Sequence, residues 1–465
     1  MNTSFLKISV LMLISFSLIT LSCKKKYETD KTKAFIKFYG GLNMDNAVDV
    51  QQTSDGGYVI AGTSNTGTSA DMLIIKTNAE GNEEWHQTFG GPNYDECASV
   101  AQLPDGGYVL LGTYGKSTRK WVYDPDEIAK GELGLEVGKD TTQMYAVKLN
   151  SSGVLLWEKK YDYSNPSVKI GTFGKTIVSN PFNTDCLFAG MVDSSYGTPG
   201  SEFVNLDLFA LIIDSDNGNL KQVFNTATST IVDTKPLRYG TVDSHDITVN
   251  AISMGSNNEY QISTYTTIAN DKTPRLVSCR LNGVALVQNT APTKTDWNEL
   301  EMVRAGQVAV ASIPNQLLLT GYKEIGTNKN IFVMTLGGAG YSNLSIQNLG
   351  DVVSSADEGV SVTKTTDGGY AVLANTNSTT YTGSIEKLID VLLIKVDAKG
   401  VESWNKVFGG RGDDQAVKVI QTTDGGYLIC GTIGFGDNTG NPGSTNKLTL
   451  MKLDSNGDIS NIKYF

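Results

Sequence analysis

Residues 55–63 read Asp-Gly-Gly-Tyr-Val-Ile-Ala-Gly-Thr, and the first four of these residues recur at three other places in the 465-residue chain. Each copy is followed by a short apolar run whose composition favours a strand over a helix. Asp-Gly-Gly is typical of a tight hairpin turn, because glycines tolerate positive φ angles and the Asp can bond to the turn backbone. Each copy therefore predicts two antiparallel strands. The four copies lie at 55–58, 105–108, 367–370 and 424–427.

The repeat extends on both sides of this turn. An Asp lies thirteen residues and a Val eight residues before each Tyr, which predicts a first strand ahead of the turn. A third apolar strand such as 72–76 follows a loop of variable length, and a fourth strand such as 85–89 carries a Trp and a second aromatic residue. Weaker copies of the second strand lie at 185–190, 259–263 and 315–321. The four recurring Asp residues are Asp45, Asp95, Asp357 and Asp414.

Seven such units, each with four short antiparallel strands, are the pattern of a β-propeller. We expect an all-β, single-domain propeller over residues 34–465, with seven blades; a ring of eight blades, one of them rudimentary, is the alternative. Strands at 34–41 and at 459–465 could each complete the terminal blade, and closing the ring there removes an exposed sheet edge. The absence of long segments with helical period excludes an α/β enzyme fold.

The N-terminus has the features of a bacterial export signal. Lys7 precedes an apolar run that is too short for a transmembrane helix and ends at Ser22-Cys23. This junction resembles a lipobox, in which a Cys is acylated, for example with palmitate, and becomes the mature N-terminus. We expect a signal peptide at 1–22, a lipidated Cys23 and a polar tether at 23–33, which would hold the protein at a membrane without spanning it. An ordinary signal peptide with an incidental Cys is the alternative.

The tandem pattern of Asp-Gly-Gly-Tyr and Trp-x-x-x-Phe-Gly-Gly resembles the Asp-Gly-Gly-Tyr-type β-propeller repeat lipoproteins of bacterial envelopes. Four of the seven units match this pattern well. The resemblance implies a propeller in the cell envelope, and we expect it to be anchored to the outer membrane, with the leaflet left open. It brings no catalytic motif to the residues of this chain.

The amino-acid composition argues against several classes of partner and of functional site. A formal net charge of −11 argues against nucleic acid as a partner. His86 and His245 are the two histidines and there is no Cys-x-x-Cys, so neither a zinc site nor a His-based catalytic triad is expected. We expect no cofactor and no metal. The cysteines after Cys23 fall in separate predicted blades and are expected to be buried free thiols, a disulfide between neighbouring blades being the alternative. They are Cys97, Cys186, Cys279 and Cys430.

The insertion at 114–143 is the candidate ligand site. Loops that join second to third strands lie on one face of a propeller, and here they vary most in length. Aromatic rings in this insertion could stack on a sugar while neighbouring carboxylates accept hydrogen bonds from its hydroxyls; a self-packed surface loop is the alternative. The candidate residues are Trp121, Tyr123, Asp124, Asp126 and Glu127.

Three other sequence patterns favour a structural role over a binding site. Segments 214–218 and 454–458 share the start of a calcium loop, but neither completes it, which favours ordinary turns. The Arg411-Gly412-Asp413 tripeptide falls in an interblade loop, and we interpret it as a coincidence. The four recurring Asp residues could ring a central channel and bind a cation, but an Asp at a strand entrance more often bonds to backbone amides.

These observations favour a lipid-anchored, non-enzymatic binding or scaffold module that is monomeric and presents its loop-rich face to a protein or a glycan. A carbohydrate-active enzyme, a glycoside hydrolase or lyase that uses the acids and aromatics of the insertion, is one alternative. A periplasmic scaffold for outer-membrane protein assembly is another. Propellers host binders and enzymes alike, so the fold does not choose among them.

Overall fold

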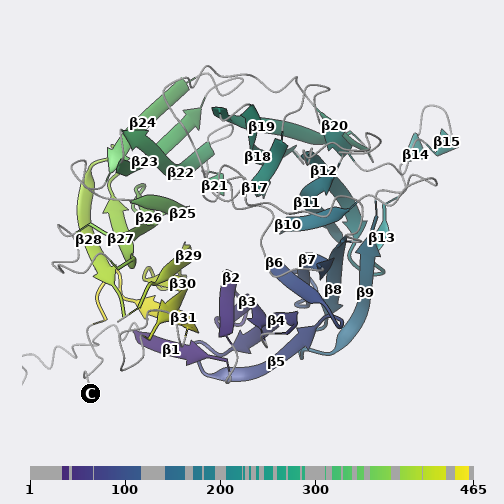
Figure 1. Ribbon diagram of the computed structural model, residues 1–465, viewed down its shortest axis with the longest axis horizontal. Coiled ribbons are helices and arrows are strands. Elements are labelled where there is room, and N and C mark those ends of the chain that lie inside the picture. Colours follow the sequence, from purple (N-terminus) through teal and green to yellow (C-terminus); the bar gives the residue numbers. More distant parts are fainter. Residues whose placement is uncertain are drawn as a thin grey trace, which may run out of the picture.

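The computed structural model shows an all-β protein whose antiparallel sheets are arranged in a ring (Figure 1). No helix occurs among the described residues, so none there is long and apolar enough to cross a membrane. The β-propeller fold predicted from the repeats is confirmed. The structure describes residues 34–40, 44–65, 68–116, 142–162, 171–180, 183–193, 206–221, 357–378, 388–410, 412–435 and 446–459, and separate strands between residues 224 and 349.

The described strands fall into seven groups of four, numbered here as blades 1 to 7 from β2 onward. Blades 1 and 2 consist of β2 (Met44–Gln52), β3 (Tyr58–Asn65), β4 (Ala70–Thr77) and β5 (Glu83–Phe89), then β6 (Tyr94–Gln102), β7 (Tyr108–Lys116), β8 (Gln143–Leu149) and β9 (Leu155–Tyr161). Blades 3 and 4 consist of β10 (Thr172–Ser179), β11 (Asp185–Asp193), β12 (Leu206–Asp214) and β13 (Asn219–Leu220), then β17 (Asp246–Met254), β18 (Glu259–Ile268), β19 (Asp271–Asn282) and β20 (Ala285–Gln288).

Blades 5 and 6 consist of β21 (Ala309–Val310), β22 (Leu317–Ile325), β23 (Asn328–Gly337) and β24 (Asn343–Leu349), then β25 (Glu358–Lys364), β26 (Tyr370–Thr376), β27 (Asp390–Val396) and β28 (Glu402–Phe408). Blade 7 consists of β29 (Gln415–Gln421), β30 (Tyr427–Gly434), β31 (Asn446–Leu453) and β1 (Phe35–Tyr39). The short strands β14 (Phe224–Asn225) and β15 (Thr230–Ile231) pair with each other, and β16 (Leu237–Tyr239) pairs with β12.

Blade 7 takes its fourth strand from the beginning of the chain. β1 runs antiparallel to β31, with Phe35 opposite Lys452 and Tyr39 opposite Leu448. The other strand expected to complete this blade, 459–465, lies outside the described residues except for Ile459. On the inner side, β2 of blade 1 packs against β29, β30 and β31 of blade 7. The first and last described strands are therefore neighbours in the ring.

The innermost strands carry a β-bulge at the same repeat position. In β2 the bulge lies between Ala47 and Asp49, and corresponding register shifts occur in β6, β10, β17, β25 and β29. A bulge re-aims the side chain beside it. Here Asp49 Oδ2 accepts hydrogen bonds from Ser99 Oγ at 2.8 Å and from the Val100 amide at 3.0 Å, both in blade 2. Oδ1 lies 2.5 Å from Lys418 Nζ of blade 7, so one carboxylate joins three blades.

The two glycines of the repeated turn have different functions. Gly56 has a φ of 84° and follows a turn closed by a 2.9 Å bond from its amide to Thr53 O, as in a hairpin with an αL residue after the turn. Gly57 does not share this positive φ, which corrects the expectation that both glycines need it. A Cβ on Gly57 would lie 2.2 Å from Thr77 O, so this position needs glycine because the backbone of β4 comes close.

A buried lysine secures each of these turns. Lys76, 2% exposed, ends β4 with its Nζ 2.8 Å from Asp55 Oδ2 and 2.9 Å from Thr77 O. Burial alone would raise the pKa of Asp55, but Lys76, the Thr53 hydroxyl and the Gly57 amide together lower that pKa to about 2. The same ion pair recurs as Lys148–Asp105, Lys395–Asp367 and Lys452–Asp424.

The Trp of the fourth strand packs against the neighbouring blade. A Cβ on Gly153, in the β8–β9 turn of blade 2, would lie 2.8 Å from the Trp85 ring of blade 1. Trp85 also meets Tyr108 edge to face, with ring centroids 5.8 Å apart. The Trp, the turn glycine and the Tyr of the repeat are thus parts of one interblade contact. Equivalent ring-over-glycine contacts are Trp157–Gly218, Trp404–Gly457 and Phe35–Gly81.

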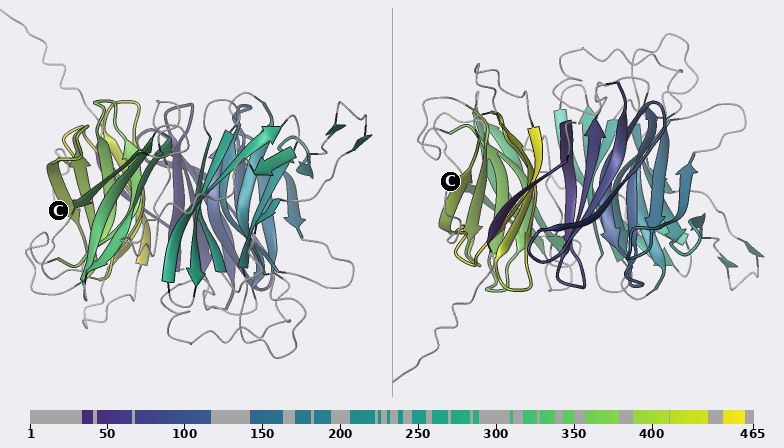
Figure 2. Two further views of the ribbon diagram at one scale, coloured as in Figure 1. Left: turned by 90° about the horizontal axis from the view of Figure 1, so that it is seen from above. Right: turned by 90° about the horizontal axis from the view of Figure 1, so that it is seen from below.

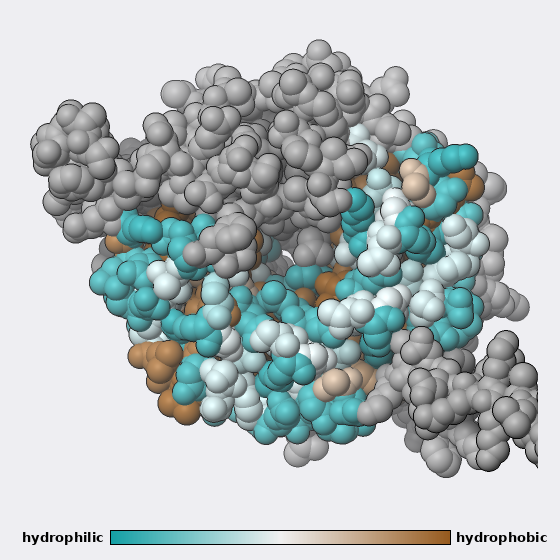
Figure 3. Space-filling model, turned by 180° about the vertical axis from the view of Figure 1, so that it is seen from behind, coloured by the Kyte–Doolittle hydropathy of each residue, from teal (hydrophilic) through white to brown (hydrophobic). Residues whose placement is uncertain are grey.

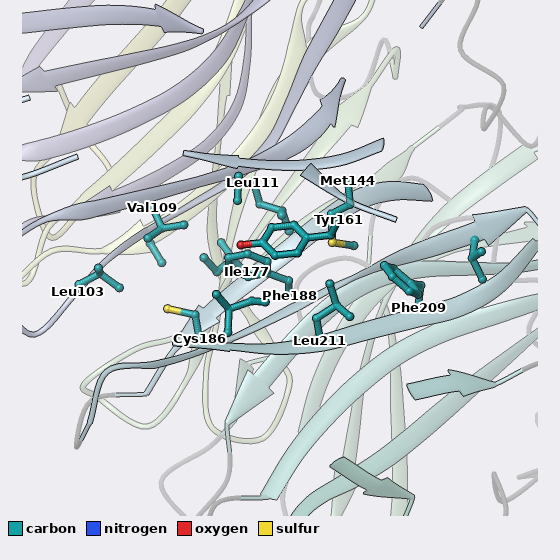
Figure 4. Close-up of a cluster of buried hydrophobic side chains, with 14 residues drawn as sticks. Leu103, Val109, Leu111, Met144, Tyr161, Ile177, Cys186, Phe188, Phe209 and Leu211 are labelled. Carbon is teal, nitrogen blue, oxygen red and sulfur yellow. The ribbon is translucent and has the colours of Figure 1, made fainter. Parts of the chain in front are cut away.

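The core lies between blades, where the broad faces of successive sheets meet. Figure 4 shows one such cluster between blades 2 and 3, in which the Tyr161 ring packs on Phe188 with centroids 5.8 Å apart. Within the described residues, Cys97, Cys186 and Cys430 are buried free thiols, as expected, and burial raises the pKa of Cys97 to about 12. The side chain of Cys279 and all of Cys23 lie outside the described residues.

Seen edge-on, the strands run between two faces of the ring (Figure 2). The Asp-Gly-Gly turns and the turns between third and fourth strands lie on one face, here called the turn face. The connections between second and third strands, and those between blades, open from the opposite loop face. Space-filling shows an exterior that is largely hydrophilic on the side drawn in Figure 3.

Candidate binding face

The predicted ligand residues of the insertion lie outside the described residues, and so does Cys23. What the structure describes is the base from which the insertion leaves. β7 ends at Lys116 and β8 begins at Gln143, both on the loop face of blade 2. The candidates Trp121, Tyr123, Asp124, Asp126 and Glu127 therefore belong to a connection that starts and ends on the loop face, and their role as ligand contacts stays a prediction.

Two tyrosines and a lysine form the floor beside this connection. Tyr114 on β7 and Tyr145 on β8 meet edge to face with ring centroids 5.4 Å apart. The ammonium of Lys160, on β9, lies 3.1 Å from the centroid of the Tyr114 ring, a cation–π contact. Tyr145 donates a 2.6 Å hydrogen bond to Glu158, and burial followed by this bond raises the pKa of Tyr145. The Tyr145 hydroxyl and the Lys160 ammonium are thus both engaged within blade 2.

Asp95 holds the end of β7 in position. Its Oδ1 accepts a 2.6 Å bond from the Gly115 amide, and its Oδ2 accepts another from the Gly91 amide. At the start of β8, the Gln143 side chain donates to both carboxylate oxygens of Asp162 at 2.7 Å. Both ends of the insertion are thus fixed by side-chain hydrogen bonds, which positions the connection on the ring.

Two of the four recurring Asp residues bond to backbone amides, as favoured from the sequence. Asp414 repeats the pattern of Asp95, accepting from the Gly434 amide at 2.8 Å and the Gly410 amide at 2.7 Å. Asp357 accepts from the Thr376 hydroxyl at 2.6 Å, whereas Asp45 is buried with its Oδ1 lacking a hydrogen-bond partner. Asp95 and Asp414 fasten interblade connections. Among the described residues no group of three or more His, Cys, Asp or Glu side chains is placed to hold a metal ion.

Two blade junctions bring carboxylates together. A Cβ on Gly90 would lie 2.2 Å from Asp71 Oδ1 and 2.6 Å from Asp95 Oδ2. A Cβ on Gly409 would meet Asp390 and Asp414 in the same way, which explains the first glycine of the Phe-Gly-Gly pattern. Burial, and then the neighbouring carboxylate, raises the pKa of Asp71. Burial outweighs two amide hydrogen bonds at Asp414 and, with Asp390 and Asp413, raises its pKa to about 6.

We predict that stability falls between about pH 4 and pH 6 as Asp414 loses its proton. The folded pKa of about 6 exceeds the reference value of 3.8, so the folded state binds the proton more tightly. Its stabilising contribution is complete below pH 3.8 and is lost as the pH rises through 6. Asp390→Asn removes a like charge and should flatten this decline in thermal midpoints measured from pH 4 to 7. The exposed Asp216→Asn serves as the control, and an unchanged slope in Asp390→Asn would refute the assignment.

The calcium-like segments are turns. Asp214 Oδ1 accepts a 2.9 Å bond from the Asp216 amide, and Asp454 Oδ1 accepts from the Asn456 amide at 2.8 Å. These are Asx-type turn bonds, so the interpretation made from the sequence is confirmed for both segments. Asp413 of the Arg-Gly-Asp tripeptide accepts the Ile389 amide at 3.1 Å, while Arg411 lies outside the described residues.

Two sets of structurally important residues were not predicted from the sequence. The buried lysines had a signal, because each lies five residues before the turn glycine of its blade, at 76 and 81, 148 and 153, 395 and 400, and 452 and 457. Tyr114, Tyr145 and Lys160 had none, since they belong to one blade and meet only when its strands pair. Tyr145 is buried with its hydroxyl bonded to Glu158, and the ammonium of Lys160 covers the Tyr114 ring, so these residues support the base of the insertion and do not themselves present a ligand-binding surface.

No protein-family model matches the sequence, and no curated protein sequence is significantly similar to it. Solved structures with a similar ring include YCF48 from Cyanidioschyzon merolae, at 8% identity and a TM-score of 0.42 over 91% of this chain and 99% of that one. Chaetomium thermophilum Sqt1, bound to the N-terminus of the ribosomal protein L10, is 11% identical with a TM-score of 0.43 over 90% and 98%. The Pseudomonas aeruginosa periplasmic gluconolactonase PpgL is 9% identical with a TM-score of 0.42 over 89% and 97%. Similarities this distant carry no inference about function.

Proposed function

We propose that this protein is a lipid-anchored β-propeller of the bacterial cell envelope that binds a glycan or protein through its loop face, without catalysing a reaction. The observation that carries the proposal is the contrast between the two faces. The turn face repeats one turn, secured by the same Lys–Asp pair in four blades. The loop face bears the longest and most variable connections, and the two ends of the longest one are held by side-chain hydrogen bonds.

The carboxylates at the described blade junctions support binding over catalysis. Asp95 and Asp414 each use both oxygens to accept backbone amides, and this fits a structural function better than proton transfer to a substrate. The acids proposed to accept hydrogen bonds from the hydroxyl groups of a glycan are those of the insertion, Asp124, Asp126 and Glu127. The chemistry of the site is therefore recognition by aromatic rings with carboxylates beside them.

The anchor is proposed from the sequence. Acylation of Cys23, as in the repeat lipoproteins that the sequence resembles, would place the propeller at the outer membrane at the end of a short polar tether. β1 begins at Phe35, so only a short stretch of sequence separates Cys23 from the first described strand. Mass spectrometry of the N-terminal peptide tests for the acyl chains.

Thermal unfolding of the full chain against a glycan panel tests the binding function. A ligand that binds the native state raises the midpoint. We predict that Trp121→Ala or Tyr123→Ala leaves the ligand-free midpoint unchanged but weakens binding by about tenfold or more, which corresponds to roughly 1.4 kcal/mol. Phe435→Ala, which removes a part-exposed aromatic ring on blade 7, is the matched control and should keep full binding.

Other outcomes would redirect the proposal. Turnover of a glycan that disappears in Asp124→Ala, Asp126→Ala or Glu127→Ala would establish the carbohydrate-active enzyme instead. If no glycan shifts the midpoint, binding partners are sought by affinity capture from detergent-solubilised envelopes. A stable complex with outer-membrane assembly proteins, protected from external protease on intact cells, would favour the periplasmic scaffold.

A further inference from the structure

Blade 2 carries a run of three exposed apolar residues that its sister blades lack. Val154, Leu155 and Leu156 are 57%, 45% and 54% exposed and immediately precede the interblade Trp157. The residues before the corresponding Trp are Asn-Glu-Glu at 82–84 in blade 1 and Val-Glu-Ser at 401–403 in blade 6. The outer strands β5, β28 and β9 each pair with one described strand, but β5 and β28 carry acidic residues just before the Trp where β9 carries leucines. Three consecutive exposed apolar residues indicate a contact surface.

This run lies on the side of the ring from which the N-terminal segment leaves. Leu155 begins β9 directly after the turn at 150–154, on the turn face. Phe35 begins β1 against Gly81, in the β4–β5 turn of the same face. Ten residues lie between Cys23 and Ala34, and these eleven steps along the chain reach up to roughly 36–40 Å. A chain anchored at Cys23 therefore has its turn face within easy reach of the bilayer.

The carboxylates of the four repeated turns do not oppose such a contact. The carboxylates of the repeated turns are exposed, but each has a lysine ammonium 2.8–2.9 Å away. Each pair is close to neutral as a unit. Three side chains also make too small a patch for a stable protein interface, which buries about 800 Å² on each partner. Apolar side chains at a membrane boundary need no such area or complementary shape.

We propose that Val154, Leu155 and Leu156 form a second membrane contact, which inserts at the lipid headgroup boundary and orients the tethered ring. With the turn-face rim of blade 2 on the bilayer, the loop face points away from it. The contact deepens the proposed function, because it rests on the same lipid anchor and explains how the ligand-binding face stays accessible.

Site-specific fluorescence tests the contact with the full acylated chain in phosphatidylethanolamine–phosphatidylglycerol vesicles. A nitrobenzoxadiazole label is placed at Val154→Cys or at Val401→Cys, in a Cys279→Ser background; Val401 is the matched control, 60% exposed at the same place in blade 6. We expect a blue shift and quenching by doxyl lipids at 154 but not at 401. Introducing Leu155→Glu and Leu156→Glu, which copies the acidic residues of blade 1, should abolish both signals while the protein stays on the vesicles.

Each other outcome overturns the contact and shows which part failed. Equal, aqueous signals at 154 and 401 on protein that floats with the vesicles and carries acyl chains would remove the contact and leave the anchor. Protein that lacks acyl chains, fails to float and shows an aqueous label at 154 would remove both. A blue shift at 154 that grows with protein concentration in detergent, without vesicles, would show that a second copy of the chain covers this surface.

Discussion

Asp49→Ala is expected to destabilise the ring by roughly 3–5 kcal/mol, the usual loss when one partner of a buried ion pair is removed. The Asp49 side chain is 9% exposed and that of Lys418 is 18% exposed, so the ammonium would be left without a counter-ion where blade 7 meets blade 1. The substitution also removes the acceptor of the Ser99 hydroxyl and the Val100 amide. Urea unfolding followed by intrinsic fluorescence measures the loss.

Two further variants separate the charge effect from a general packing defect. Asp49→Asn keeps an acceptor for the amides and should lose less than Asp49→Ala. Lys418→Met in the Asp49→Ala background removes the stranded ammonium and should recover a large part of the stability. If the double variant is as unstable as Asp49→Ala, or if Asp49→Ala loses less than about 1 kcal/mol, the ion pair does not hold the blades together.

The same substitution at the two adjacent turn glycines should have opposite results. Gly56→Asn is expected to be nearly neutral, because Asn tolerates the left-handed conformation and no atom lies within 4 Å of the new Cβ. Gly57→Asn is expected to lose stability at or above the upper end of the about 1–3 kcal/mol typical of overpacking. Its Cβ would lie 2.2 Å from Thr77 O and 2.8 Å from Lys76 Nζ, so β4 must move and the Lys76–Asp55 pair must break.

Thermal midpoints of the two Asn variants check this prediction, and Gly107→Asn in blade 2 repeats the test. A Cβ on Gly107 would lie 2.6 Å from Leu149 O, the equivalent backbone contact. The prediction is wrong if Gly57→Asn and Gly56→Asn shift the midpoint equally, since the second glycine would then be dispensable.

The sequence predicted most of the fold because the information is local and repeated. The tripeptide Asp55-Gly56-Gly57 predicts a turn by itself. The apolar runs after Tyr58 and Tyr427 likewise predict second strands without reference to distant residues. Contacts between blades were harder to predict, because Trp85 and Gly153 interact through a packing that no spacing within one repeat reveals. A lysine that ends a strand, such as Lys76, looks like a solvent-exposed residue until the turn folds over it.

The candidate site was less predictable because it is specific to one blade. The turns of the turn face can be predicted because their sequence repeats. Trp121 and Tyr123, however, belong to an insertion with no counterpart in the other repeats. The described residues at the base of this insertion, Tyr114, Tyr145 and Lys160, come from three strands. A ligand site of this kind depends on residues that do not recur from one repeat to the next, so the repeat pattern does not predict it.

The pairing of β1 with β31 has a consequence for biogenesis. β1 is the first of the described strands to be synthesised, and its partner β31 is the last, as Phe35 pairs with Lys452. Until then β1, with its two inward-facing aromatic residues Phe35 and Tyr39, stays unpaired. Contacts this far apart in sequence make folding slow. A chaperone that shields β1 should therefore raise the yield of native protein more than one acting on any internal blade.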